Sequence, residues 1–293
     1  MFGNPRRWLA LCAALLLCGS ATGAGEAPVR VFEWTIDAPW FGGFSGIEIS
    51  DDGAFILTVG DRGVILAASL QREKGLITAI DVDYAGLLKD HKGRDLQGYW
   101  TDPEGIAARD NSEFCLAFEG IARVVCHETP ETDARMLPRP HAFRALPSNR
   151  SLEALAVDDD GRLIALAEHV DDSGRIPFFV WTDEAWSIGS SVAASDGYIP
   201  VGADIGPDGR FYILERALRM VGFQSRLRRW DYADGAVSGT GDIVWESSKG
   251  SHDNLEGVAL WKKPSGQIWA TMISDDNFRF FQRTEIVEIP VPD

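Results

Sequence analysis

SLEALAVDDDGRLIALAEH, residues 151–169, decides the fold. Two runs of small and apolar residues flank Asp160-Gly161, and such a dipeptide between such runs is the strongest local signal for a β-hairpin. Folding the segment symmetrically about this turn places Glu153 opposite Glu168. Directly opposed like charges destabilise a sheet by roughly 0.2–1 kcal/mol. Two facing carboxylates therefore need a partner that neutralises them.

The same pattern occurs five times, at 44–63, 103–120, 151–169, 201–217 and 255–277. Copies of one hairpin that start about 50 residues apart are typical of a β-propeller with four strands per blade. Two further strands follow each of the first four copies, and we expect the outermost strand of the second blade at 140–146. Residues 284–289 give the fifth copy a third strand, and residues 29–36 can supply its fourth.

The sequence therefore predicts an all-β fold. We expect one domain over residues 29–289, a five-bladed β-propeller whose last blade is closed by the N-terminal strand. A six-bladed ring with one degenerate blade is the alternative.

Residues 1–24 have the features of a secretory signal peptide. Arg6 and Arg7 precede the apolar run WLALCAALLLC, and small residues follow it. Leu16 and Leu17 before Cys18 do not match the small residues of a lipoprotein signal, so we do not expect a lipid anchor. No later segment is apolar enough to span a membrane. We predict a periplasmic or secreted protein.

The charge of the chain limits its partners. The full sequence carries −16, and the mature chain, which loses two arginines, carries −18. Such a field repels nucleic acid and attracts cations. We expect a monomer that binds a small molecule or a phosphate ester rather than nucleic acid.

Two cysteines remain after export, Cys115 and Cys126. A turn near 119–122 would place them opposite each other on paired strands, which suits a disulfide in an oxidising compartment. Two reduced thiols in the core are the alternative.

Acidic residues recur at two places in the hairpins, the start of the first strand and the end of the second. Both places lie at the same end of a blade because the two strands are antiparallel. The first strands begin with Ser45, Glu104, Glu153, Val201-Gly202 and Glu256, and the second strands end with Asp61, Glu119, Glu168, Glu215 and Asp275-Asp276. Symmetric folding also places Glu104 opposite Glu119. We therefore expect one acidic rim around the axis.

Three kinds of partner can neutralise such a rim. Ca²⁺ suits clustered carboxylates. Arg62, Arg150 and Arg216 stand beside the acidic positions and can pair with them. Shared protons would raise one pKa of each pair and provide an acid and a base.

Four segments, DPEGIA at 102–107, NRSLEALAV at 149–157, GDRG at 60–63 and ISDDNFRFFQRTEIVEI at 273–289, resemble the phytase-like family, described as "esterase-like activity of phytase". The resemblance covers roughly residues 40–289. It implies an exported bacterial propeller with recurring acids and suggests phosphate-ester hydrolysis. The positions that match the family's acidic pattern are Asp61, Arg62, Glu104, Glu153, Glu256, Asp275, Asp276 and Asn277. Ser45 and Gly202 depart from it.

The chemical hypothesis is metal-assisted hydrolysis of a phosphate ester or phosphodiester. We expect Ca²⁺ to be held by Glu104, Glu153, Glu256, Asp61, Asp275, Asp276 and Asn277. Arg62 and Arg150 would bind the phosphate oxygens, and Glu119 or Glu168 would activate water. The alternative is a propeller without catalysis, whose rim binds a ligand or protein and contains a structural cation or a carboxylate–arginine lattice. The sequence contains no G-x-S-x-G motif that would indicate a serine nucleophile.

Overall fold

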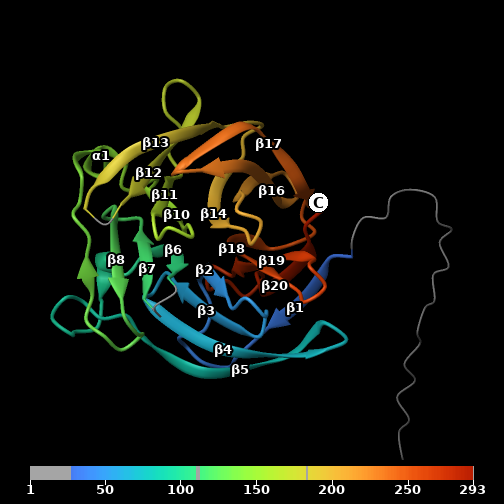
Figure 1. The fold of residues 1–293 in the computed structure, drawn as a ribbon. Coiled ribbons are helices and arrows are strands. Elements are labelled where there is room, and N and C mark those ends of the chain that lie inside the picture. The colour runs from blue at the N-terminus through green and yellow to red at the C-terminus, as the bar shows by residue number, and fades with distance from the viewer. Residues whose placement is uncertain (1–27, 110–112, 183, 293) are drawn as a thin grey trace, which may run out of the picture.

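Five four-stranded antiparallel sheets form a ring in the computed structural model, which describes residues 28–109, 113–182 and 184–292 (Figure 1). From inner to outer strand, blade 1 comprises β2 (Phe44–Ile49), β3 (Phe55–Gly60), β4 (Val64–Glu73) and β5 (Leu76–Leu87), and blade 2 comprises β6 (Pro103–Ala108), β7 (Phe114–Phe118), β8 (Arg123–His127) and β9 (Arg135–Met136). Blade 3 comprises β10 (Leu152–Val157), β11 (Leu163–Ala167), β12 (Arg175–Trp181) and β13 (Trp186–Ala193), and blade 4 comprises β14 (Ile199–Ile205), β15 (Phe211–Arg219), β16 (Gly222–Ala233) and β17 (Ala236–Glu246). Blade 5 comprises β18 (Asn254–Lys262), β19 (Ile268–Asp275), β20 (Thr284–Pro290) and β1 (Arg30–Trp34).

The two ends of the chain meet in blade 5. Strand β1 pairs with β20 in a continuous antiparallel register that runs from Arg30–Glu288 to Trp34–Thr284. The first strand of the propeller thus completes the sheet that the last three strands begin. The predicted five-bladed fold and its closure are confirmed, and the six-bladed alternative is wrong.

The core consists of five apolar clusters, each between two neighbouring blades. The cluster between blades 2 and 3, for example, joins Leu152 and Leu163 to Phe143, which is 1% exposed. Each blade is covered by a neighbour on both sides, so its strands carry apolar residues on both faces. These residues form the apolar layers. This packing holds the inner strands side by side around the axis.

One predicted strand is a helix. Residues 140–146 contain α1 (His141–Ala145), which begins directly after Pro140. The helix places Phe143 against Phe179 and Trp186 of blade 3, with ring centroids 5.1 and 4.9 Å apart. The fourth strand of blade 2 is instead β9, a pair of residues. The other helical element, η1 (Gly98–Trp100), is a single 3₁₀ turn before β6.

The first 27 residues, which include the predicted signal peptide and Cys18, lie outside the described residues. In the part of the chain that the structure describes, neither helical element approaches the length or apolar character needed to cross a bilayer.

Candidate functional site

Every inner strand contains a β-bulge at the same place. The ladder between the first two strands of each blade skips one residue: Ser45, Glu104, Glu153, Val201 and Glu256. We call these five residues the bulge ring. A bulge leaves one residue without a cross-strand partner and redirects its side chain. Three of the five are glutamates, in blades 2, 3 and 5.

The residue after the bulge explains why the inner strands of neighbouring blades approach so closely. At Gly105 a Cβ atom would lie 2.6 Å from the backbone nitrogen of Leu155 in the next blade, and at Gly257 it would lie 2.9 Å from that of Ile47. Neighbouring inner strands therefore touch through their backbones at this level, where only glycine or another small residue fits. The bulge ring lies directly outside this contact, at one end of the propeller.

A second set of side chains lies beside the bulge ring. In blades 1 to 3, the first residue beyond the second strand pairs with the residue two positions before the bulge. The backbone nitrogens of Asp61, Glu119 and Glu168 donate to the carbonyls of Gly43, Asp102 and Ser151 over 2.9–3.0 Å. The equivalent positions in blades 4 and 5 are Arg216, opposite Ile199, and Asp275, opposite Asn254. We call Asp61, Glu119, Glu168, Arg216 and Asp275 the strand-end ring, and this end of the propeller the mouth.

The predicted direct pairs Glu104–Glu119 and Glu153–Glu168 are wrong. The turn of blade 3 closes through a hydrogen bond from the Asp158 nitrogen to the Arg162 carbonyl, with Gly161 at φ 80°, and Leu155 pairs with Ala165. The register is thus displaced by one residue, and the bulge adds a second displacement. Glu153 and Glu168 still converge at the mouth, whereas Glu104 and Glu119 belong to two different groups of carboxylates.

Glu215 was expected at the rim, but Arg216 occupies that position. Glu215 is fully buried and pairs with Arg226 over 2.5 Å and Arg228 over 3.3 Å inside blade 4. Alternation along a strand sends neighbouring side chains to opposite faces, so an error of one residue exchanges an acid for a cation. Blade 4 therefore contributes a positive charge to the mouth and no carboxylate.

Carboxylate oxygens gather in two groups of three. Those of Asp61, Asp102 and Glu104 lie within 4.8 Å of one another, as do those of Glu119, Glu153 and Glu168. Asp102 was not singled out from the sequence. Its position directly before the inner strand, two residues from the bulge, is the signal that identifies it.

A hydrogen-bonded lattice joins the remaining acids. Asn254, also missed, donates from Nδ2 to Glu256 over 2.8 Å and to Asp275 over 3.3 Å. Arg216 donates to the Asn254 side-chain oxygen over 2.5 Å and forms an ion pair with Glu256. A single cation from blade 4 thus neutralises one carboxylate of blade 5.

The pKa values of the mouth carboxyls are high. Burial, and after it the neighbouring carboxylates, raises the pKa of Asp102 to about 6, of Glu119 to about 7 and of Asp275 to about 8. The same two causes raise the pKa values of Glu104 and Glu153 well above their usual range. Burial also raises the pKa values of Asp61, Glu168 and Glu256. Without a counter-charge, several of these groups hold protons at neutral pH.

Asp276 and Asn277 form a turn beside the mouth. The Asp276 carboxylate accepts from the amide nitrogens of Gly43 over 3.0 Å and Phe278 over 2.9 Å, and from the Thr284 hydroxyl over 3.3 Å. Asn277 is exposed, and its backbone nitrogen donates to the Asp275 carboxylate over 2.6 Å. Both residues thus shape the loop next to Asp275, and neither belongs to a carboxylate group of three.

The two predicted phosphate-binding arginines lie at the edge of the mouth. The Arg62 guanidinium stacks on the Phe278 ring at 3.3 Å from its centroid. Arg150 is 67% exposed and lies 3.8 Å from Glu168. Arg150 thus forms a long ion pair with one mouth carboxylate, and Arg62 lies against an aromatic ring beside the mouth.

The opposite end of the inner strands carries a smaller acidic pair that sequence reasoning missed. Glu48 accepts from the Ala108 nitrogen over 2.9 Å, and Asp204 accepts from the Leu260 nitrogen over 2.6 Å. Each carboxyl thus ties its blade to the next. Burial raises the pKa of Asp204 to about 7, and burial together with Asp204 raises that of Glu48 well above its usual range.

The predicted disulfide is present. Cys115 of β7 and Cys126 of β8 are cross-strand partners and are bonded. Residues 119–122 connect these strands at the mouth, so the bond stabilises the hairpin that carries Glu119.

Three solved structures are similar to the chain at low sequence identity. The chain is 12% identical to a protein of unknown function from Dyadobacter fermentans DSM 18053, with a TM-score of 0.47 and coverage of 89% of this chain and 86% of the other. It is 12% identical to an endo-arabinase from Bacteroides thetaiotaomicron VPI-5482, with a TM-score of 0.49 and coverage of 86% and 94%. For YCF48 from Cyanidioschyzon merolae the values are 12%, 0.42, 87% and 84%. No curated protein matches the chain.

Comparison with protein families gives a specific result. Residues 39–278 match the phytase-like family, described as "Esterase-like activity of phytase". This range includes the inner strands of all five blades, and with them the bulge ring and the strand-end ring. The chain therefore belongs to the phytase-like family.

Proposed function

We propose that the mouth binds divalent cations, with Ca²⁺ the best fit, and hydrolyses a phosphate ester or phosphodiester. The observation that carries the proposal is the pair of three-carboxylate groups, each with its oxygens within 4.8 Å, at one end of the propeller. Oxygen ligands at such spacing are what Ca²⁺ prefers. The raised pKa values of these carboxyls indicate that the protein itself supplies too little positive charge to neutralise them.

The group Asp61, Asp102 and Glu104 is the first cation site in this proposal. Glu256 and Asp275 adjoin it, since both act electrostatically with Asp61. The Ser45 hydroxyl donates to Asp61 over 2.7 Å and orients that carboxylate. A bound cation would polarise the phosphoryl oxygen and offset the negative charge that otherwise repels an anionic substrate.

Glu119 is the proposed general base. A pKa of about 7 leaves it partly ionised at neutral pH, where a base is most effective. Glu153 and Glu168 lie within 4.8 Å of it and hold a second cation or a water molecule. Arg62 and Arg150, at the edge of the mouth, bind the remaining phosphate oxygens.

A structural role for the cation is the second candidate function. The specific observation in its favour is the link from Arg216 in blade 4 through Asn254 to Glu256 in blade 5, which ties neighbouring blades together without any substrate. A cation among the other carboxylates would tie blades 1, 2 and 3 in the same way.

The test combines calorimetric titration of the chelator-treated protein with Ca²⁺ and a turnover assay with bis(p-nitrophenyl) phosphate and p-nitrophenyl phosphate. We expect saturable Ca²⁺ binding, weakened in Glu104→Gln, and Ca²⁺-dependent turnover. Glu119→Gln should keep Ca²⁺ binding and lose about 10²–10⁴-fold in kcat, the usual contribution of a general base. Glu153→Gln should lose turnover with the fold intact.

The control is Glu73→Gln, the same change at an exposed position at the end of β4. It should behave as wild type in both assays. Ca²⁺ binding that raises the melting temperature without turnover of either ester favours the structural role. Absence of Ca²⁺ binding refutes both.

A further inference from the structure

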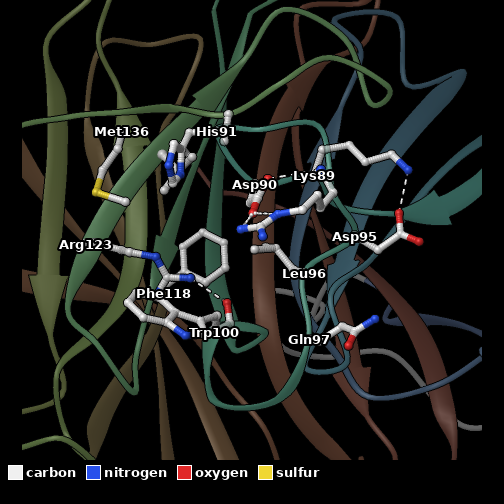
Figure 2. Close-up of a pocket in the computed structure, with 13 residues that line it drawn as sticks. Lys89, Asp90, His91, Asp95, Leu96, Gln97, Trp100, Phe118, Arg123 and Met136 are labelled. Carbon is white, nitrogen blue, oxygen red and sulfur yellow. Dashed lines mark hydrogen bonds and ion pairs between the residues drawn. The ribbon is translucent and has the colours of Figure 1, made fainter.

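A second pocket lies outside the mouth, between the segment 88–100 and the face of blade 2 (Figure 2). Its volume is about 510 Å³, which is within the range of small-molecule sites. Most of its wall is apolar, from Leu96, Trp100, Phe118, Val125, Ala134 and Met136. Trp100 and Met136 are each 48% exposed, so both offer apolar surface to a ligand.

The loop that forms one wall is already folded. The Leu96 nitrogen donates to the Leu88 carbonyl over 2.8 Å, and the Asp90 nitrogen donates to the Arg94 carbonyl over 2.7 Å. The Ala134 nitrogen donates to the Asp90 carbonyl over 3.2 Å and fixes the loop to blade 2. A ligand would therefore enter a preformed cavity and would not have to order it.

The acids of this loop are paired. Asp90 forms an ion pair with Arg94 over 2.6 Å, and Asp95 forms one with Lys89 over 2.5 Å, as Figure 2 shows. These two pairs leave no net charge. His91 lies on the same wall and adds no negative charge.

Arg123 supplies a buried cation that forms no close ion pair with a described carboxylate. It is 3% exposed and lies over the Phe118 ring, 3.8 Å from its centroid. Its hydrogen bonds go to two carbonyls, those of Trp100 over 2.5 Å and Ile121 over 3.2 Å. Among the carboxylates that the structure describes, none lies within 4.0 Å of its guanidinium. Two carbonyls leave most of the five N–H donors of an arginine unused.

The charge of Arg123 persists at neutral pH. Burial, and then Arg139, lowers its pKa to about 10, while Asp102 acts in the opposite direction. A buried cation is costly without an anion beside it. The pocket thus combines an apolar wall with a positive charge that is offset only by the more distant Asp102 among the carboxylates that act on it.

We propose that this pocket binds a small amphipathic organic anion. Its acidic group would lie at Arg123, and its aromatic or aliphatic body would lie along Trp100, Leu96 and Met136. This site is distinct from the mouth and requires neither a metal ion nor catalysis there.

The test uses two fluorescent probes that differ in one group. Both 8-anilinonaphthalene-1-sulfonate and N-phenyl-1-naphthylamine have the same aromatic body, and only the first has an anionic group. In titrations followed by fluorescence, we expect one saturable site for the sulfonate and at least tenfold weaker binding of the neutral probe.

Two matched variants locate the site. Met136→Glu places a carboxylate on the exposed wall and should weaken sulfonate binding at least tenfold. Met220→Glu makes the same change at a residue that is 103% exposed on blade 4, and it should leave binding unchanged. Arg123→Gln should bring the affinities of the two probes together, with circular dichroism used to verify the fold.

Three results would overturn the proposal: equal binding of the two probes to the wild type, unchanged sulfonate binding in Met136→Glu, or no saturable site. Each is independent of Ca²⁺ and of ester turnover, so failure here does not affect the proposed function of the mouth.

Discussion

Arg216 is the single cation of the strand-end ring, and its environment shows how one residue sets the charge balance of the mouth. It forms an ion pair with Glu256, and its charge also acts on Glu153 and Glu168. Its side chain is 18% exposed and that of Glu256 is 14% exposed. At such burial, the loss of one partner leaves the other charge poorly solvated.

Arg216→Gln should therefore destabilise the metal-free protein by about 3–5 kcal/mol at pH 8, the range for breaking a buried ion pair from one side. The loss should be smaller at pH 5, because protonation of Glu256 removes the charge that Arg216 neutralised. Urea unfolding at the two pH values measures the difference. An equal loss at both would show that Arg216 acts through packing alone.

Single positions also show where sequence reasoning succeeds. Glu104, Glu153 and Glu256 were identified because each stands before a small residue at the start of an inner strand, and the structure brings all three to the mouth. Glu215 was placed wrongly because the choice between neighbouring residues depends on a register that composition does not reveal.

The β-bulges are the element that could not be predicted from the sequence. Symmetric folding about Asp160-Gly161 predicts an unbroken ladder, whereas the real ladder omits Glu153. In the other four blades a glycine follows the bulge and lies close to the backbone of the next blade, which is a long-range contact. Likewise, Pro140 begins a helix where a strand was expected, since Phe143 packs against blade 3. Hairpins could be predicted from local pattern, but contacts between blades could not.

The hairpin of β7 and β8 provides a test at this scale. The bond between Cys115 and Cys126 closes a short loop, with a sequence separation of 11. In the chain-entropy treatment, closing a loop of this size with a disulfide stabilises the folded state by about 3 kcal/mol. The double change Cys115→Ala and Cys126→Ala should reduce the free energy of unfolding by about that amount.

Urea denaturation of the double variant and of the wild type measures this loss, and the wild type in reductant serves as a control for the lost side-chain volume. Coincident unfolding midpoints for the oxidised wild type and the double variant would contradict the prediction. Slower ester turnover at unchanged Ca²⁺ binding in the double variant would show that the bond also positions Glu119.

At the scale of the whole molecule, the carboxyls with raised pKa values at the mouth determine how stability depends on pH. Asp102, Glu119 and Asp275 have pKa values of about 6, 7 and 8 in the folded protein, whereas free carboxyl groups titrate near about 4. The folded protein thus retains protons that the unfolded chain releases. The contribution of these carboxyls to the free energy of unfolding therefore falls as the pH rises from about 5 to about 8.

We accordingly expect the melting temperature of the chelator-treated protein to be highest near pH 5 and to decrease steadily towards pH 8. Saturating Ca²⁺ should remove most of this decrease, because a bound cation favours the ionised carboxylates. Differential scanning calorimetry over this range, with and without Ca²⁺, is the measurement. A melting temperature that stays constant or rises towards pH 8 without Ca²⁺ would contradict the raised pKa values.

The pairing of β1 with β20 has a consequence for biosynthesis. The ribosome makes β1 first and its partner last, so this strand must wait without a partner until translation is complete. A chain that stops before β20 leaves two open sheet edges, which are templates for pairing with other chains. Ring closure therefore distinguishes finished from unfinished chains, and prematurely terminated products should be the ones that aggregate or are degraded.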